Sequence, residues 1–136
     1  MFPVKANALA QQLGRSGRLL IVDDSNIMRR HIERSQHFDD LEVVGTAANG
    51  VEAVELFKET DPDLVTMDLT MPHMDGIECI AQLVALKPTV RILVISALAD
   101  KATAVEAMEK GANGFLNKPF TDRQLNEALA ELLQGM

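Results

Sequence analysis

Charged and hydroxyl side chains stand where the apolar runs of this sequence stop. Asp23 and Asp24 follow the first run, Asp68 ends the third, Ser96 ends the fourth and Lys118 ends the fifth. Short apolar runs bounded by turn residues are typical of strands buried on both faces of a parallel sheet. Because ligands bind beyond the carboxyl ends of such strands, we expect these five side chains to form one site.

Three carboxylates at that edge favour a bound cation. At separations of about 5 Å and an effective dielectric constant of about 20, each pair of charges repels by about 3 kcal/mol. Ligation by oxygen alone selects a hard ion, and Mg²⁺ keeps coordinated waters that leave room for a phosphoryl oxygen. The sequence therefore predicts that Asp23, Asp24 and Asp68 hold Mg²⁺.

Lys118 and Ser96 would complete an anion cradle around Asp68. In this hypothesis Asp68 is the nucleophile that attacks phosphorus and forms an acyl phosphate. Lys118 and the metal neutralise the phosphoryl oxygens, and the Ser96 hydroxyl responds to the phosphate. Each residue alone has an ordinary structural explanation, such as a helix cap for Asp68, but their joint appearance at strand ends indicates a functional site.

The elements that position these residues alternate strand and helix along the chain. Right-handed crossovers between consecutive parallel strands then predict an α/β fold with an open, doubly wound sheet of five strands. The expected strands are Arg18–Val22, Leu41–Thr46 at a sheet edge, Leu64–Asp68, Arg91–Ser96 and Phe115–Lys118. The expected helices run from Asn26 to about Ser35, from Asn49, from the loop after Asp68 to before Pro88, from Ala99 or Asp100 to a C-cap at Gly111, and from Thr121.

Helical periodicity predicts which side chains face the sheet. They are Ile27, Met28 and Ile32; Val51, Val54 and Phe57; Ile77, Ile80, Leu83 and Val84; Val105 and Met108; and Leu125, Ala128, Leu129 and Leu132. Ser25 is expected to cap the first helix, and capping boxes are expected at Asn49 with Glu52 and at Thr121 with Gln124.

Composition limits the class of protein. With 136 residues, 47% of them apolar, the chain is expected to form one globular domain, preceded by a leader over residues 1–17. A single cysteine, Cys79, excludes an intrachain disulfide, and no apolar run has the length of a membrane span, so we expect a cytoplasmic protein with no membrane partner. The net charge of −7 and the lack of a basic cluster argue against direct nucleic-acid binding.

Taken in order, these motifs resemble those of response-regulator receiver domains, and their spacing resembles the CheY-like, single-domain members. The matching residues are Asp23-Asp24, Asp68, Pro72, Met74-Asp75-Gly76, Ser96-Ala97 and Lys118-Pro119-Phe120. The resemblance covers residues 18 to about 133 and implies a receiver domain over 18–136 with strand order 2-1-3-4-5.

The resemblance also implies a function, that of a regulator and not an enzyme. Asp68 would take a phosphoryl group from a phosphohistidine on a sensor histidine kinase or phosphotransfer domain. Asp24, Asp68 and the Thr70 backbone carbonyl would bind Mg²⁺ directly, and Asp23 would do so mainly through water. Lys118 would pair with the phosphoryl group, across a cis Lys118-Pro119 peptide.

In this family Ser96 and an aromatic residue, here Phe115, would act as the switch. A downstream protein would read the face formed by the fourth helix, fifth strand and fifth helix, where Lys101, Glu106, Lys110 and Arg123 are expected to be exposed. Two departures are that Ser96 stands where threonine is commoner and that Phe115 replaces a tyrosine. Thr70 and Leu98 occupy positions that tune phosphate lifetime in the family.

Three other functions fit parts of the pattern. A magnesium-dependent phosphatase of the haloacid-dehalogenase type also forms an aspartyl phosphate, but it needs a second acid where this chain has Thr70. A flavin-binding electron carrier shares the architecture, but the chain has no Trp or Tyr to stack on the ring. A scaffold with a vestigial pocket is disfavoured because every chemical residue is present.

Overall fold

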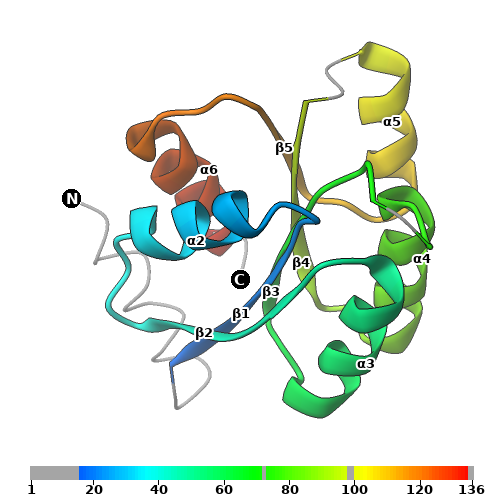
Figure 1. The fold of residues 1–136 in the computed structure, drawn as a ribbon, viewed down its shortest axis with the longest axis horizontal. Helices are drawn as coiled ribbons and strands as arrows, with labels where there is room; N and C mark the ends of the chain where they lie inside the picture. Colours follow the sequence, from blue (N-terminus) through cyan, green and yellow to red (C-terminus); the bar gives the residue numbers. More distant parts are fainter. Residues whose placement is uncertain (1–15, 72, 98–99, 135–136) are drawn as a thin grey trace.

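A five-stranded parallel sheet forms the centre of the molecule, with strand order β2-β1-β3-β4-β5 (Figure 1). The computed structural model describes residues 16–71, 73–97 and 100–134. The strands are β1 (Gly17–Val22), β2 (Leu41–Ala47), β3 (Leu64–Met67), β4 (Arg91–Ser96) and β5 (Gly114–Asn117). The predicted doubly wound fold and strand order are confirmed, and the predicted strand ends agree within one residue.

Helices cover both faces of the sheet. They are α2 (Asn26–Ser35), α3 (Gly50–Thr60), α4 (Gly76–Leu86), α5 (Lys101–Glu109) and α6 (Asp122–Gln134). Figure 1 shows α2 and α6 on one side of the strands and α3, α4 and α5 on the other. Among the described residues, no helix has both the length and the hydropathy needed to cross a bilayer.

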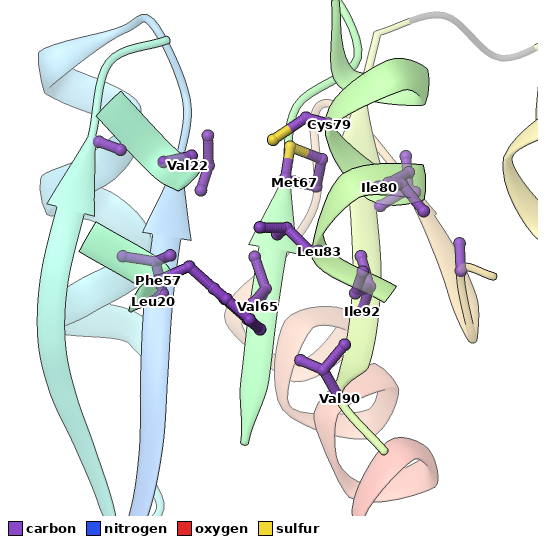
Figure 2. Packing of buried hydrophobic residues seen from close by; sticks show 14 of the residues in the cluster. Leu20, Val22, Phe57, Val65, Met67, Cys79, Ile80, Leu83, Val90 and Ile92 are labelled. Atoms are coloured by element: carbon purple, nitrogen blue, oxygen red, sulfur yellow. The ribbon is translucent and has the colours of Figure 1, made fainter. Parts of the chain in front are cut away.

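Each face of the sheet has its own hydrophobic core. On the face of α3 and α4, side chains from β1, β3 and β4 meet Phe57, Cys79, Ile80 and Leu83 (Figure 2). On the face of α2 and α6, Leu19, Ile21 and Ile95 of the strands pack with Ile32, Leu125 and Leu129. The central strands are thus buried on both sides, as their unbroken apolar runs predict, and their polar ends lie at the edge of a rigid core.

Side-chain caps define where the helices begin. Ser25 Oγ accepts from the Met28 amide, and Thr121 and Gln124 form the reciprocal capping box that their spacing predicts. At α3 the box is shifted, because the Glu52 carboxylate accepts from the amide of Ala48 and not from that of Asn49. Gly111 follows the end of α5 with φ +118°, a left-handed conformation that suits the predicted glycine.

Four predicted core residues are wrong. Ile27 is 81% exposed, and Val51, Val105 and Met108 are between 45% and 47% exposed. In α2, Ile27 lies one position before Met28 of the inward-facing stripe, and in α3, Val51 lies one position after the buried Gly50, so each is turned about 100° away from the side that faces the sheet. In α5 the buried side chain is the small Ala107.

Some predictions fall on parts of the chain outside the described residues. They are the leader up to residue 15, Pro72 of the loop after β3, Leu98, and Ala99 as a possible first residue of the helix after β4. Of the leader, the structure describes Ser16 and Gly17, and Gly17 already belongs to β1, where it pairs with Leu41 of β2.

Candidate functional site

Asp68 lies at the carboxyl end of β3, in the middle of the sheet. Its amide donates to the Val22 carbonyl at 2.9 Å, which extends the pairing of β3 with β1 by one residue. The residue is only 2% exposed. The Thr70 amide donates to Asp68 Oδ1 over 3.5 Å, a long contact from the loop that follows. A carboxylate is therefore held almost out of solvent at the edge where ligands are expected.

The acids that follow β1 lie beside Asp68. One carboxylate oxygen from each of Asp23, Asp24 and Asp68 lies within 4.8 Å of the others, as the strand order requires of neighbouring strand ends. Asp23 is 1% exposed, whereas Asp24 is exposed to solvent. The predicted cluster of three carboxylates is thus brought together.

Lys118 reaches this cluster from the end of β5, the strand at one edge of the sheet. It follows β5, and its amide donates to the Ser96 carbonyl at 3.0 Å. Its Nζ lies 2.6 Å from Asp23 Oδ2 and 3.7 Å from Asp68 Oδ1. The Lys118-Pro119 peptide is cis, as the resemblance implied. Ser96, the last residue of β4, is completely buried between the ends of β3 and β5.

The surroundings of Asp68 disfavour its charge. Burial, followed by the negative charge of Asp23, raises the pKa of Asp68 from 3.8 to about 6. Asp24 adds a smaller effect of the same sign, while the ammonium of Lys118 and the Thr70 amide act in the opposite direction. A cation at this place would remove that penalty. Three oxygen donors within 4.8 Å, with no nitrogen or sulfur ligand among them, suit Mg²⁺.

The comparisons with known proteins agree with this geometry. A model of the response regulator receiver domain family matches residues 19–130. The chain belongs to this family.

Receiver domains that act in chemotaxis are among its relatives. The chain is 45% identical to the chemotaxis protein CheY of Listeria monocytogenes over 112 residues, which are 82% of this chain and 94% of that protein. It is also 45% identical to the CheY protein of Thermotoga maritima, over 82% of this chain and 93% of that one.

Solved structures give the same assignment. The CheX-CheY-BeF3-Mg+2 complex of Borrelia burgdorferi matches with a TM-score of 0.86 at 30% identity, covering 97% of this chain and 98% of that one. A two-component response regulator of the LuxR family from Aurantimonas matches with a TM-score of 0.82 at 34% identity, covering 88% and 86%. The fold and the family are therefore established, and CheY-like receiver domains are regulators.

Two further predicted positions of the receiver domain, Phe115 and Thr70, lie among the described residues. Phe115 in β5 is half-buried and packs against the core on the α3 and α4 face. Thr70 is exposed, and its amide contacts Asp68. The roles proposed for the Thr70 carbonyl and for Phe115 stay predictions.

Gly76, at the start of α4, lets that helix approach the site loop. A Cβ atom on Gly76 would lie 2.3 Å from the Asp68 carbonyl oxygen and 2.6 Å from the Leu69 Cα. Its own amide donates to the Leu69 carbonyl at 3.1 Å. The absence of a side chain at Gly76 therefore allows the start of α4 to lie directly against the backbone of Asp68 and Leu69.

One residue of the site was missed by the sequence reasoning. Arg29 of α2 donates from Nη1 to the backbone carbonyl of Asp23 at 2.7 Å. The available signal was a basic side chain in the first turns of a helix, a place where acids are favoured.

Proposed function

We propose that this chain is a phosphoryl-accepting signalling switch of a two-component system, with Asp68 as the acceptor. The observation that carries the proposal is the surroundings of the buried Asp68 carboxylate. The carboxylates of Asp23 and Asp24 lie within 4.8 Å of it, and the ammonium of Lys118 lies 3.7 Å away. Such an arrangement suits the transfer of a dianionic phosphoryl group, in which catalysis consists mainly of positioning and charge stabilisation.

Asp23, Asp24 and Asp68 would hold Mg²⁺, together with the Thr70 carbonyl, and Asp23 would do so mainly through water. When bound, Mg²⁺ supplies positive charge that offsets both the carboxylates and the phosphoryl oxygens. Asp68 would then be held in the ionised form that nucleophilic attack needs.

In the transfer step an Asp68 Oδ attacks phosphorus in the phosphohistidine of a sensor histidine kinase or phosphotransfer domain. The P–O bond forms as the P–N bond breaks, and the electron pair of that bond stays on the imidazole. The product is an acyl phosphate on Asp68. Lys118 stabilises the phosphoryl oxygens as the transfer proceeds, because its ammonium already lies beside the attacking carboxylate.

The signal would then pass through Ser96 and Phe115. The Ser96 hydroxyl moves toward the phosphoryl group, and Phe115 turns inward as Ser96 moves. A protein partner reads the changed face formed by α5, β5 and α6, where Lys101, Glu106, Lys110 and Arg123 are exposed. The solved Borrelia complex, which pairs a CheY protein with CheX, supports a protein as the reader of this domain.

Intact-mass measurement tests the proposal directly. The chain is incubated with Mg²⁺ and acetyl phosphate, and a gain of one phosphoryl group is expected. Asp68→Asn is expected to abolish the gain, and Asp39→Asn, at an exposed acid outside the site, is expected to keep it. Chelation of Mg²⁺ is expected to slow the reaction strongly.

Two results would count against the switch. One is an unchanged mass in a sample that calorimetry shows to bind Mg²⁺. The other is steady turnover of unrelated phosphate esters without a regulatory partner, which would favour the phosphatase alternative.

A further inference from the structure

The side chain of Arg29 folds back from α2 onto the loop that carries the acid pair. Its Nη1 donates to the Asp23 carbonyl at 2.7 Å, and its Nη2 donates to Asn26 Oδ1 at 3.3 Å. The guanidinium therefore bridges the first turn of α2 and the peptide group that joins Asp23 to Asp24. Its planar donors hold both contacts in one orientation.

With this contact, every polar group of Asp23 has a partner. The amide donates to the Ala47 carbonyl at 3.0 Å, and the carbonyl accepts from Arg29. The carboxylate accepts from the Ser25 amide at 2.9 Å and from Lys118 Nζ at 2.6 Å. Asp23 is thus fixed at its backbone and at both of its carboxylate oxygens.

Asp24 has no comparable support. Its side chain is exposed, and within the described part of the chain no hydrogen bond or ion pair reaches its carboxylate. Its Cα, however, belongs to the same planar peptide group as the Asp23 carbonyl. Holding that carbonyl fixes the peptide plane before Asp24, and the Ser25 amide, which donates to Asp23 Oδ1, fixes the plane after it. The two planes together set the direction in which the Asp24 side chain leaves the backbone.

The stability of α2 does not explain why a cation stands here. The first turns of a helix favour negative charge, and α2 has no acid in its first turn. A guanidinium near this end therefore works against the helix dipole. The hydrogen bonds to the Asp23 carbonyl and to Asn26 account for its position.

We propose that Arg29 is a positioning residue, which fixes the peptide group between Asp23 and Asp24 and so presents the Asp24 carboxylate to Mg²⁺. This inference rests on the metal site of the proposed function. Arg29 itself contacts neither the metal nor the phosphoryl group. It acts through the backbone of the two acids.

The direction in which the Mg²⁺ affinity changes when Arg29 is removed separates a positioning role from a purely electrostatic one. A cation beside a metal site repels Mg²⁺, so a purely electrostatic role predicts that removing Arg29 strengthens binding. Positioning predicts the opposite, because a mobile Asp24 makes a poorer ligand. Substitutions of residues that orient metal ligands weaken metal binding by about 10-fold or more.

Calorimetric titration with Mg²⁺ measures the affinity of each variant, and thermal unfolding without metal shows whether each variant is folded. Arg29→Met is expected to bind Mg²⁺ about 10-fold more weakly than the unsubstituted chain. Arg29→Lys keeps the positive charge but loses the planar guanidinium donors, so it tests the geometry of the contact apart from its charge. An intermediate Mg²⁺ affinity is expected. The control is Arg30→Met, which removes a neighbouring exposed arginine of the same helix and is expected to leave the affinity unchanged.

Unchanged or tighter Mg²⁺ binding by Arg29→Met would overturn the inference, as would equal weakening in Arg30→Met. If Arg29→Met does not unfold cooperatively, the test uses Arg29→Lys instead. This variant is expected to bind Mg²⁺ more weakly than the control Arg30→Met. A lower melting temperature with unchanged Mg²⁺ affinity would assign Arg29 a structural role only. Failure of the unsubstituted chain to bind Mg²⁺ or to accept a phosphoryl group would instead refute the proposed function.

Discussion

The ammonium of Lys118 lies 2.6 Å from Asp23 Oδ2, closer than the 3.7 Å that separates it from Asp68 Oδ1. Asp23 is 1% exposed, so this ion pair supplies the positive charge that a buried carboxylate requires. For Lys118 to reach a phosphoryl group on Asp68, its contact with Asp23 has to loosen. In the proposed function, Lys118 and Mg²⁺ would therefore compete for Asp23 before phosphorylation, and both would stabilise a phosphoryl group on Asp68.

Lys118→Met is expected to change metal binding and phosphorylation in opposite directions. Removing the ammonium leaves the carboxylates uncompensated, so Mg²⁺ binds more tightly. Phosphorylation slows by about 100-fold, because the transition state loses a preorganised charge. Calorimetry and timed intact-mass measurements check the two effects.

Lys87→Met is the matched control for this prediction. Lys87 also pairs with two acids, at 3.0 Å from Asp61 and 3.4 Å from Asp63, but at the opposite end of the sheet. It is expected to leave both the Mg²⁺ affinity and the phosphorylation rate unchanged. Slower phosphorylation without tighter Mg²⁺ binding in Lys118→Met would contradict the competition for Asp23.

Asp68→Asn is expected to stabilise the metal-free protein at neutral pH. Because the folded pKa of about 6 lies above the ordinary 3.8, the folded state binds more protons between these values, and stability falls as pH rises through them. The loss of stability caused by the Asp68 charge is complete above about pH 6 and absent below about pH 3.8. The neutral amide avoids it, with a gain of up to about 3 kcal/mol at pH 8 and little at pH 4.

Urea unfolding of Asp68→Asn and the unsubstituted chain at several pH values measures this difference. Asp39→Asn, at an exposed acid, serves as the control for loss of one negative charge. An equal stability difference at pH 4 and pH 8 would show that the charge of Asp68 is not the cause.

Gly76→Ala is expected to destabilise the protein and to displace the site loop. The added Cβ would lie 2.3 Å from the Asp68 carbonyl oxygen, which is backbone and cannot turn aside. A cost of about 3 kcal/mol is expected from overpacking of this kind. Phosphorylation should slow as well, since the backbone of Asp68 is what moves.

Gly45→Ala is the control for Gly76→Ala. In β2 the added Cβ would lie 3.5 Å from the nearest atom, a side-chain carbon of Leu20, which is an ordinary contact. Its stability is expected to stay within about 1 kcal/mol of the unsubstituted chain. Similar losses in the two variants, measured by urea unfolding, would argue against the close approach at Gly76.

Thr66→Val is expected to stabilise the protein. Thr66 in β3 is 1% exposed, and its hydroxyl has no hydrogen-bond partner within the described residues. An isosteric methyl group removes the desolvation cost of that hydroxyl, a gain of about 1 kcal/mol. Thr103→Val is the contrasting variant, because the Thr103 hydroxyl donates to Asp100 at 2.8 Å, and it is expected to lose stability. Loss of stability in Thr66→Val would indicate a partner for its hydroxyl.

Much of the fold could be read from local pattern. The apolar runs and the caps at Ser25 and Thr121 give the order and nearly the ends of the elements, because strand length and capping depend on neighbouring residues. The side chains facing the core were predicted less well. Helical periodicity identifies an apolar stripe, but a helix such as α5 buries its small Ala107 and leaves Val105 and Met108 exposed.

Some features of the candidate site could likewise be predicted from the sequence, and others could not. The identity of the side chains at the strand ends followed from local pattern, since Asp23, Asp24, Asp68 and Lys118 come directly after apolar runs. Three features came from the folded chain: Lys118 lies nearer Asp23 than Asp68, burial raises the pKa of Asp68, and Arg29 donates to the Asp23 carbonyl. The physical reason is that distances between strand ends, and the depth of a carboxylate below the surface, follow from the packing of segments far apart in the chain.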